Sequence, residues 1–236
     1  MNFVGQVGQW FLDANHWQGD FGIPNRLLEH LSMSAASLAA AAVIALPIGV
    51  LLGHFGRGGN LAINISNVGR AVPSFALLVL AVQLVGIGAL PAFIALVALG
   101  IPPMVTNSYV GLREVDEDIR EAARGMGMRQ RAILWRVELP IALPFIMAGV
   151  RTSAVNIVAT ATLAAVVAWG GLGRFIIDGF SQRDTAQIFA GALLVALLSI
   201  VVELGLSAAQ RLTVPKGLLA AQPIEEVTPG PVPVLI

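Results

Sequence analysis

Cysteine is absent from this 236-residue sequence, and charged residues are scarce. The missing cysteine excludes disulfide bonds, thiolate metal sites and cysteine nucleophiles. Only 12% of the residues are charged, against about 25% in soluble domains, while 56% are apolar. Together with a mean hydropathy of +0.80, this composition indicates an integral membrane protein. The formal net charge is zero, which argues against nucleic acid as a partner.

Lysine is almost missing as well, because Lys216 is the only one. A Walker phosphate-binding loop needs serine or threonine directly after its glycine-lysine pair, but Gly217 follows Lys216. ATP must therefore be handled by another polypeptide. The histidines His16, His30 and His54 share no ligand spacing, so we predict no metal site and expect each to be solvated or interfacial. No nucleophile–base pair is apparent, so we predict no catalytic residue and no bound cofactor.

Five apolar stretches are long enough to cross a bilayer, whose hydrocarbon core of roughly 30 Å needs about 20 helical residues. They are residues 31–53, 72–88, 90–110, 141–169 and 186–208. The third stretch contains Pro102 and Pro103, which we expect to kink or break its helix. The sequence therefore predicts an all-α polytopic membrane protein with five transmembrane helices.

The two ends of the chain differ from this apolar middle. We predict that residues 1–30 form an extracytoplasmic or interfacial segment, with Trp10 and Trp17 suited to the headgroup zone. Because it lacks a basic start and carries Asp13, this segment is not expected to be a cleavable signal. The proline-rich composition of residues 212–236 predicts a disordered or loosely draped cytoplasmic tail. Residues 31–211 between them form the predicted transmembrane domain.

Basic residues are concentrated on one side of the predicted spans, as they are on the cytoplasmic side of membrane proteins. On that side lie Arg57, Arg70, Arg113, Arg120, Arg124, Arg129, Arg131, Arg136, Arg211 and Lys216. The opposite side carries Arg26, Arg174 and Arg183, interleaved with acidic residues. We therefore predict an outside N-terminus and a cytoplasmic C-terminus.

The segment between the third and fourth spans is the most informative one, because it is charged and amphipathic. Asp116, Glu117 and Asp118 open a predicted short helix and Arg124 lies near its end, in the order that the helix dipole favours. A narrow apolar face follows from the spacing of Ile119, Ala122, Ala123 and Met126. Gly125 and Gly127 can supply a left-handed turn after the helix. Such a face can enter a groove on a partner. A basic loop can also lie flat on anionic lipid, but the leading carboxylates count against that.

A longer motif runs through this segment and comprises Glu121, Ala122, Ala123, Gly127, Val137, Leu139 and Pro140. Its spacing resembles the EAA loop of ATP-binding-cassette (ABC) importer permeases, with Val137 where isoleucine is usual. The resemblance spans about residues 27–211. It implies a MetI-like ABC importer permease fold, in which residues 113–140 form a coupling loop that enters a cleft of a cytoplasmic ATPase. The coupling residues that it implies are Ile119, Glu121, Ala122, Ala123, Met126, Gly127, Leu139 and Pro140.

Shorter motifs at residues 70–78, 101–107, 137–151 and 170–173 resemble those of osmoprotectant permeases. They imply a bacterial inner-membrane, multi-pass subunit that moves glycine betaine, choline, carnitine or a related quaternary amine into the cytoplasm. Methionine and other amino-acid permeases share parts of these motifs, so an amino acid is the alternative cargo. A non-transporting membrane scaffold is a remote alternative. The implied partners are a cytoplasmic ATPase dimer that uses ATP and Mg, a second identical or homologous permease subunit, an extracytoplasmic substrate-binding protein and the bilayer.

Polar residues within the spans are candidates for a solute pathway, because such residues are costly in lipid. Ser153, Asn156 and Thr160 follow helical spacing in the fourth span, and Asn107 is a weaker candidate. The alternative is ordinary hydrogen bonding between helices. Arg151 and Glu203 are expected to lie at a similar depth and to pair. Aromatic cages usually recognise quaternary amines, but the spans are poor in Tyr and Trp. Selectivity is therefore assigned to the separate binding protein.

Overall fold

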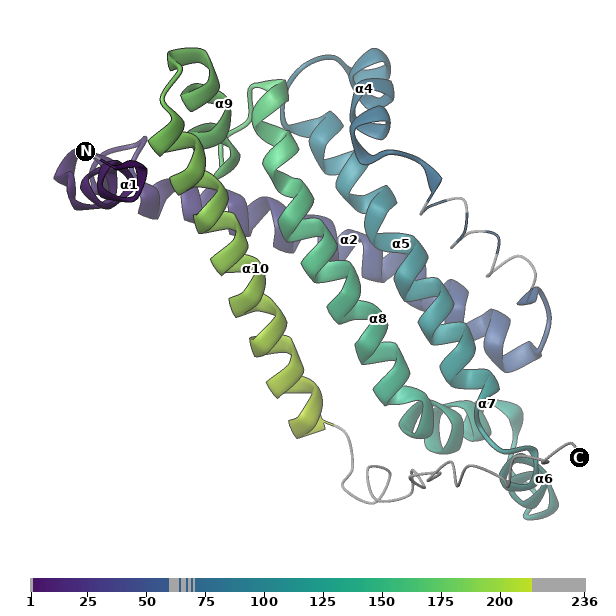
Figure 1. Cartoon of the computed structure of the whole chain (residues 1–236). Helices are drawn as coiled ribbons and strands as arrows, with labels where there is room; N and C mark the ends of the chain where they lie inside the picture. The colour runs from purple at the N-terminus through teal and green to yellow at the C-terminus, as the bar shows by residue number, and fades with distance from the viewer. Residues whose placement is uncertain (1, 60–63, 65–66, 68, 70, 214–236) are drawn as a thin grey trace, which may run out of the picture.

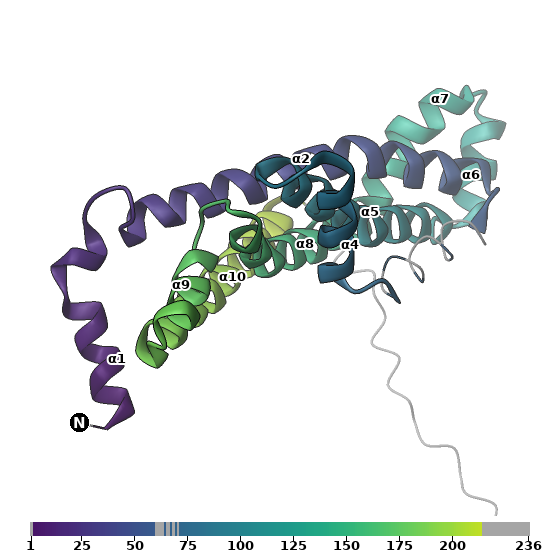
Figure 2. The same cartoon turned by 90° about the horizontal axis from the view of Figure 1, so that it is seen from above.

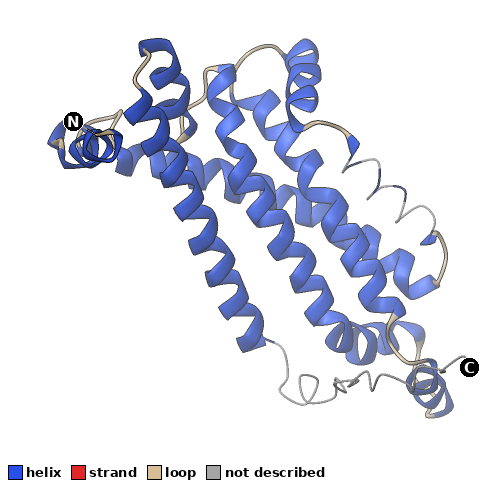
Figure 3. Cartoon of the chain, viewed as in Figure 1, coloured by secondary structure: helices blue, strands red, loops and turns tan. Residues whose placement is uncertain are grey.

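The computed structural model describes residues 2–59, 64, 67, 69 and 71–213. Within these residues the regular secondary structure is entirely helical (Figure 3), which confirms the predicted all-α class. Arg70, Lys216 and the predicted tail beyond Thr213 lie outside the described residues.

The described helices succeed one another along the chain. Their order is α1 (Phe3–Leu12), η1 (Ala14–Trp17), α2 (Ile23–Phe55), α4 (Ser74–Val85), α5 (Ala89–Arg113), α6 (Glu117–Gly125), α7 (Gln130–Ile133), η2 (Leu134–Glu138), α8 (Leu139–Thr160), η3 (Ala161–Val167), α9 (Gly173–Gln182) and α10 (Thr185–Thr213). η2 is a π-helix, whereas η1 and η3 are 3₁₀-helices.

Among the described residues, four helical stretches are long and apolar enough to cross a membrane. They are Ile23–Phe55, Ala89–Arg113, Gln130–Val167 and Thr185–Leu212. The predicted second span is represented by α4, whose 12 residues reach only about 18 Å at 1.5 Å per residue. α4 is short because it starts after Pro73 and stops at Gly86, whose φ of 85° lies in the left-handed region. The part of the chain that the structure describes thus has four membrane-length helices and a shorter apolar one.

Two boundaries differ from those predicted. α2 begins at Ile23, with Pro24 in its first turn, so the predicted division between residues 30 and 31 falls inside one helix. The expected break at Pro102 and Pro103 is absent, because α5 is continuous through both residues. Neighbouring helices and hydroxyl side chains re-satisfy backbone groups freed by proline in membrane helices. Near the proline pair, the Ser153 hydroxyl of α8 donates a hydrogen bond to the Gly100 carbonyl of α5, at 2.7 Å, which links the two helices.

The long helices form an elongated bundle. α5, α8 and α10 run side by side, and α2 crosses one face of them, in contact with α5 and α8 (Figures 1 and 2). α6 and α7 lie at one end of the bundle, which we call the α6 end, and α1 and α9 lie at the opposite end. α4 packs against α5.

The two ends of the described chain lie far apart. The Phe3 ring contacts the Phe189 ring near the start of α10, with 5.4 Å between centroids. Near the other end of α10, the Gln210 amide donates to the Pro144 carbonyl on the first turns of α8, at 3.0 Å. α1 therefore lies beside the start of α10, whereas the end of α10 lies beside the start of α8.

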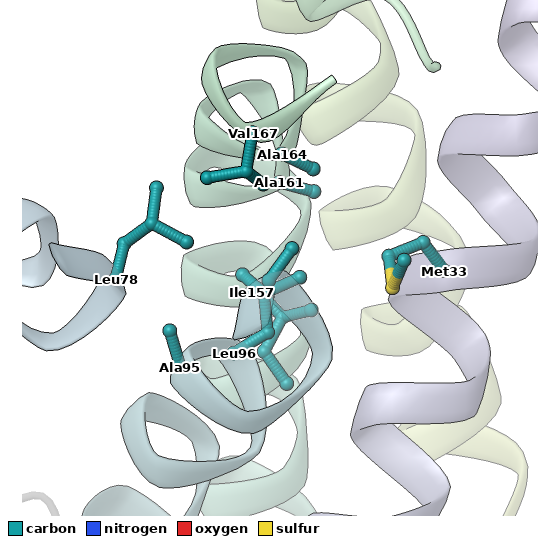
Figure 4. Packing of buried hydrophobic residues seen from close by; sticks show 9 residues of the cluster. Met33, Leu78, Ala95, Leu96, Ile157, Ala161, Ala164 and Val167 are labelled. Carbon is teal, nitrogen blue, oxygen red and sulfur yellow. The ribbon is translucent and has the colours of Figure 1, made fainter. Parts of the chain in front are cut away.

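Side chains from five elements meet in one buried cluster. Figure 4 shows Met33 of α2 and Leu78 of α4 beside Leu96 of α5 and Ile157 of α8, with Val167 of η3 above them. Helices without a hydrophobic driving force between them associate by close packing of small residues. A Cβ atom on Gly49 of α2 would lie 2.7 Å from the Val105 carbonyl oxygen of α5. The bundle therefore holds its membrane helices together through glycine contacts as well as through this cluster.

Candidate functional site

The predicted short helix between the third and fourth spans is confirmed as α6. Asp116 caps it, because its side chain accepts a hydrogen bond from the Asp118 amide at 2.9 Å. Gly127, with a φ of 79°, supplies the left-handed turn, and the Met128 amide then donates to the Ala123 carbonyl at 3.1 Å. Gly125 belongs to the helix itself. Local sequence signals thus place both ends of α6.

Acidic and basic side chains are paired along the surface of α6. Arg124 donates to Glu117 at 2.9 Å, and the Arg120 guanidinium lies 3.3 Å from the same carboxylate. The hydrogen bond from Arg124 is the main reason that the pKa of Glu117 lies below its usual value. Both Glu117 and Arg124 are well exposed, so this pair organises the helix surface and adds little stability.

The four residues of the predicted apolar face differ in their exposure to solvent. Ile119, Ala122 and Met126 are exposed, and Met126 reaches 75%. Ala123 is only 2% exposed, because it faces the body of the protein together with Arg120. Of the predicted apolar face, the structure thus leaves Ile119, Ala122 and Met126 exposed and buries Ala123.

The remaining motif residues have separate positions. Glu121 and Gly127 are exposed on or beside α6. Leu139 and Pro140 form the first turn of α8, and both line an open apolar groove between the second half of α2 and the segment α7–η2–α8. The motif therefore combines an exposed helix with the point where the chain re-enters the bundle.

A buried ionic cluster of His54, Arg120 and Glu138 lies next to α6. Glu138 Oε2 lies 2.5 Å from His54 Nδ1, and Glu138 Oε1 lies 3.1 Å from Arg120 Nε. The side chains of His54, Arg120 and Glu138 are 7%, 4% and 2% exposed. Arg120 also donates to the Leu112 carbonyl at the end of α5. The cluster thus joins residues from α2, α6 and η2 to the end of α5.

Sequence reasoning missed this cluster and expected His54 to be solvated or interfacial; its buried side chain contradicts the solvated alternative. The same holds for His30, which is buried with Nε2 2.8 Å from the Val158 carbonyl oxygen. The available signal was the location of Arg120 and Glu138. Arg120 directly precedes the EAA triplet and Glu138 stands between Val137 and Leu139, so both charges occupy positions that the motif leaves open.

The structure does not bring the predicted pathway residues together. Ser153 is completely buried and is used in its bond to the Gly100 carbonyl of α5, the helix–helix alternative left open by the sequence. Asn107 is partly buried and donates to the Pro103 carbonyl of its own helix at 2.8 Å. Asn156 is exposed on α8, and Thr160 lines a narrow gap toward α4. Asn156 is thus the candidate that is both exposed and polar.

The predicted pair between the fourth and fifth spans is confirmed, with Arg151 Nε of α8 3.2 Å from Glu203 Oε1 of α10. At the end opposite α6, Glu29 accepts hydrogen bonds from Arg26 and from the Gly171 amide, each at 2.7 Å. This second contact fastens the glycine-rich segment before α9 to α2. Trp10, predicted to suit the headgroup zone, is buried against His16 and Phe175.

Known proteins are similar to this chain in sequence and in fold. Residues 45–216 match the family described as binding-protein-dependent transport system inner membrane component. The choline transport system permease protein OpuBB of Bacillus subtilis is 36% identical over 190 residues, which cover 80% of this chain and 88% of that protein. The glycine betaine/carnitine/choline transport system permease protein OpuCB of the same organism is 35% identical over 190 residues, with the same coverage of 80% and 88%.

A solved structure shows the same fold. A chain of the MetNI methionine ABC transporter in an inward-facing conformation superposes with a TM-score of 0.69 at 25% identity, covering 80% of this chain and 94% of that one. The relatives and the superposition each cover about 80% of the chain, and the family match includes the EAA motif. This chain belongs to the family of inner membrane components of binding-protein-dependent transport systems.

Proposed function

We propose that this chain is the permease subunit of an ATP-driven importer that moves osmoprotectants such as glycine betaine, choline or carnitine into the cytoplasm. The observation that carries the proposal is its 35–36% identity, over 80% of the chain, to permeases named for these solutes. The structural relative named for methionine shares 25% identity. The osmoprotectant is therefore the favoured cargo.

The exposed face of α6 is the proposed contact with a separate ATPase. Ile119, Ala122 and Met126 present an apolar strip at the α6 end, flanked by the exposed carboxylate of Glu121. An apolar strip on a short helix suits insertion into a groove of a partner protein. Ala123 has a different role in this proposal, because its buried methyl group seats α6 on the permease itself.

The α6 end is the proposed cytoplasmic end. Exposed arginines gather on and around α6 and α7, namely Arg57, Arg113, Arg124, Arg129, Arg131 and Arg136. Positive charge favours the cytoplasmic side of a membrane. In this orientation α1 lies outside, and the end opposite α6 receives the substrate-binding protein.

A second permease subunit, identical or homologous, would cover the exposed side of α8. Thr152 and Asn156 lie exposed on that helix one turn apart. An amide facing lipid is costly, which favours burial against another subunit or in a wet pathway. Asn156 is accordingly the residue that we propose to line the solute path between two subunits.

These parts suggest a transport cycle. ATP binding by the ATPase dimer displaces the groove that holds α6, and α6 moves the attached ends of the membrane helices. The path between the two permeases then opens to the loaded binding protein, and it returns to an inward-facing form after hydrolysis.

Reconstitution tests the cargo and the class together. The chain is combined with its ATPase and binding protein in proteoliposomes, and glycine betaine, choline, carnitine and methionine are compared as stimulators of ATP hydrolysis and uptake. We expect a quaternary amine to stimulate both, and stimulation by methionine alone would reverse the assignment. A scaffold without a transport role would show no uptake with any of the four solutes.

The absence of native cysteine makes the α6 contact directly testable. Single cysteines at positions 119, 122 and 126 should cross-link to cysteines introduced along the groove of the ATPase, whereas a buried cysteine at position 123 should not. If none of the three exposed positions forms a cross-link, the contact through α6 is refuted.

A further inference from the structure

The buried ionic cluster of His54, Arg120 and Glu138 connects α6, the proposed contact with the ATPase, to the membrane helices. Arg120 belongs to α6, Glu138 ends the π-helix η2, and His54 lies in the last turn of α2. Glu138 contacts both partners, with its two oxygens 2.5 Å from His54 Nδ1 and 3.1 Å from Arg120 Nε. One carboxylate thus joins elements that are far apart in the sequence.

The cluster holds these elements together because its charges are costly to separate. The Glu138 side chain is 2% exposed, so water cannot replace Arg120 as its partner. A buried charge that loses its partner is strongly destabilising, so moving the Arg120 and Glu138 side chains apart is costly. Arg120 also bonds to the Leu112 carbonyl, so the end of α5 is included in the same unit. A displacement of Arg120 must therefore carry its neighbours with it.

Few other buried contacts attach α6 to the rest of the protein. Within α6, Arg120 and Ala123 are the buried residues. Ala123 contributes one methyl group, which can slide over its neighbours, whereas Arg120 contributes a buried ion pair with Glu138 and a hydrogen bond to the Leu112 carbonyl. The mechanical connection of α6 therefore depends mainly on Arg120.

The backbone of η2, which carries Glu138, is unusual. η2 has the wider π-helical turn and continues without interruption into α8, the helix that carries Asn156. Short π-helical segments occur frequently at functional sites. Because Glu138 is the last residue of η2, a pull on its carboxylate acts at the junction between η2 and α8.

We propose that His54, Arg120 and Glu138 are positioning residues that transmit movement of α6 to α2 and α8, and so couple ATP hydrolysis to solute movement. This inference rests on the proposed function, in which α6 is driven by a separate ATPase. It assigns this transmission to three residues outside the EAA motif, and these residues would act without contacting the ATPase or the solute.

The test measures solute imported per ATP hydrolysed, in proteoliposomes that contain the full complex. Arg120→Gln and Glu138→Gln each remove one charge of the pair while keeping a polar side chain. We expect each variant to retain ATP hydrolysis and to lower the ratio of solute to ATP by roughly 2- to 30-fold, the range found for mutations that weaken coupling between sites. The double variant should lose no more than the worse single variant, because both changes break one connection.

A matched control separates coupling from stability. His30→Gln removes another buried histidine that contacts a backbone carbonyl, at the end of the bundle opposite α6. It should lower the unfolding temperature of the complex but leave the ratio of solute to ATP unchanged. If Arg120→Gln or Glu138→Gln fails to assemble, His54→Gln and Glu138→Asp provide milder changes in the same cluster.

The possible results are distinguishable. If assembled cluster variants import as much solute per ATP as the wild type, the inference is overturned while the proposed function stands. If the wild-type complex itself shows no ATP-dependent uptake, the proposed function fails first. If His30→Gln lowers the ratio as much as the cluster variants do, the effect is general destabilisation and the inference is also overturned.

Discussion

Replacing Gly49 by valine should destabilise the bundle where α2 and α5 touch. A Cβ atom at position 49 would lie 2.7 Å from the Val105 carbonyl oxygen and 2.7 Å from Ser108 Cβ. Val105 and Ser108 are fully buried, and the closest atoms belong to the backbone or lie next to it, so no flexible side chain can move aside. The two helices must separate, or their side chains must take up strain.

The expected cost comes from overpacking, which is typically about 1–3 kcal/mol in a close-packed core. Exchange of glycine for valine inside a helix also gains roughly 0.3–0.5 kcal/mol of intrinsic propensity, and this gain must be removed. Gly205→Val on α10 is the matched control, because a Cβ atom there meets nothing within 4 Å. The difference between the two variants isolates the packing effect, with an expected shift of about 5- to 150-fold in the unfolding equilibrium.

Unfolding of the purified protein in lipid bicelles, followed by steric trapping, measures this difference. A difference under about 0.5 kcal/mol between Gly49→Val and Gly205→Val would contradict the close approach of α2 and α5, because surface substitutions already vary by that amount.

Three further predictions concern the site and its surroundings. In a double-mutant cycle of thermal stability, Arg151→Ala and Glu203→Ala should show a coupling energy of about 0.2–1 kcal/mol, since their 3.2 Å pair is partly exposed, and strict additivity would contradict the pair. Ser153→Ala should lower the free energy of unfolding by about 0.6 kcal/mol and leave uptake unchanged. Asn156→Leu should reduce uptake and leave stability unchanged. The reverse pattern would assign the solute pathway to Ser153 instead. Gly127→Ala should cost about 1–2 kcal/mol, because its φ of 79° strains other residues, and should weaken ATPase binding in a pull-down, while unchanged binding would show that the turn does not position α6.

Membrane-length helices were predictable because an apolar run must form its hydrogen bonds within itself when it lies in lipid. The same rule is silent on where a helix stops once it leaves the apolar run. α2 extends back to Ile23 because Pro24 suits a first turn and the polar side chains of Arg26 and Glu29 pair with each other. α5 passes through Pro102 and Pro103 because α2 and α8 support it, and such support cannot be read from one segment.

α6 was predictable to its ends because its signals are local. The Asp116 cap, the early carboxylates and the left-handed Gly127 all lie within one short segment. The orientation of the helix was not predictable from that segment, because a nearly all-alanine face can dock by either edge. The body of the protein makes the choice by burying Ala123 beside Arg120, which leaves Ile119 and Met126 in solvent.

The ionic cluster shows why the remaining part of the site could not be predicted without the three-dimensional structure. His54 and Glu138 are 84 residues apart, and many exposed arginines near α6 could have served as partners for Glu138. Composition still contains a constraint, since an acidic residue bordered by apolar ones must be paired or neutral when it is buried. Glu138 stands between Val137 and Leu139 at the entry to a membrane helix, so, when buried, it must either have a cationic partner or be protonated. Only the fold determines that this partner is Arg120, which connects α6 to the residue that directly precedes α8.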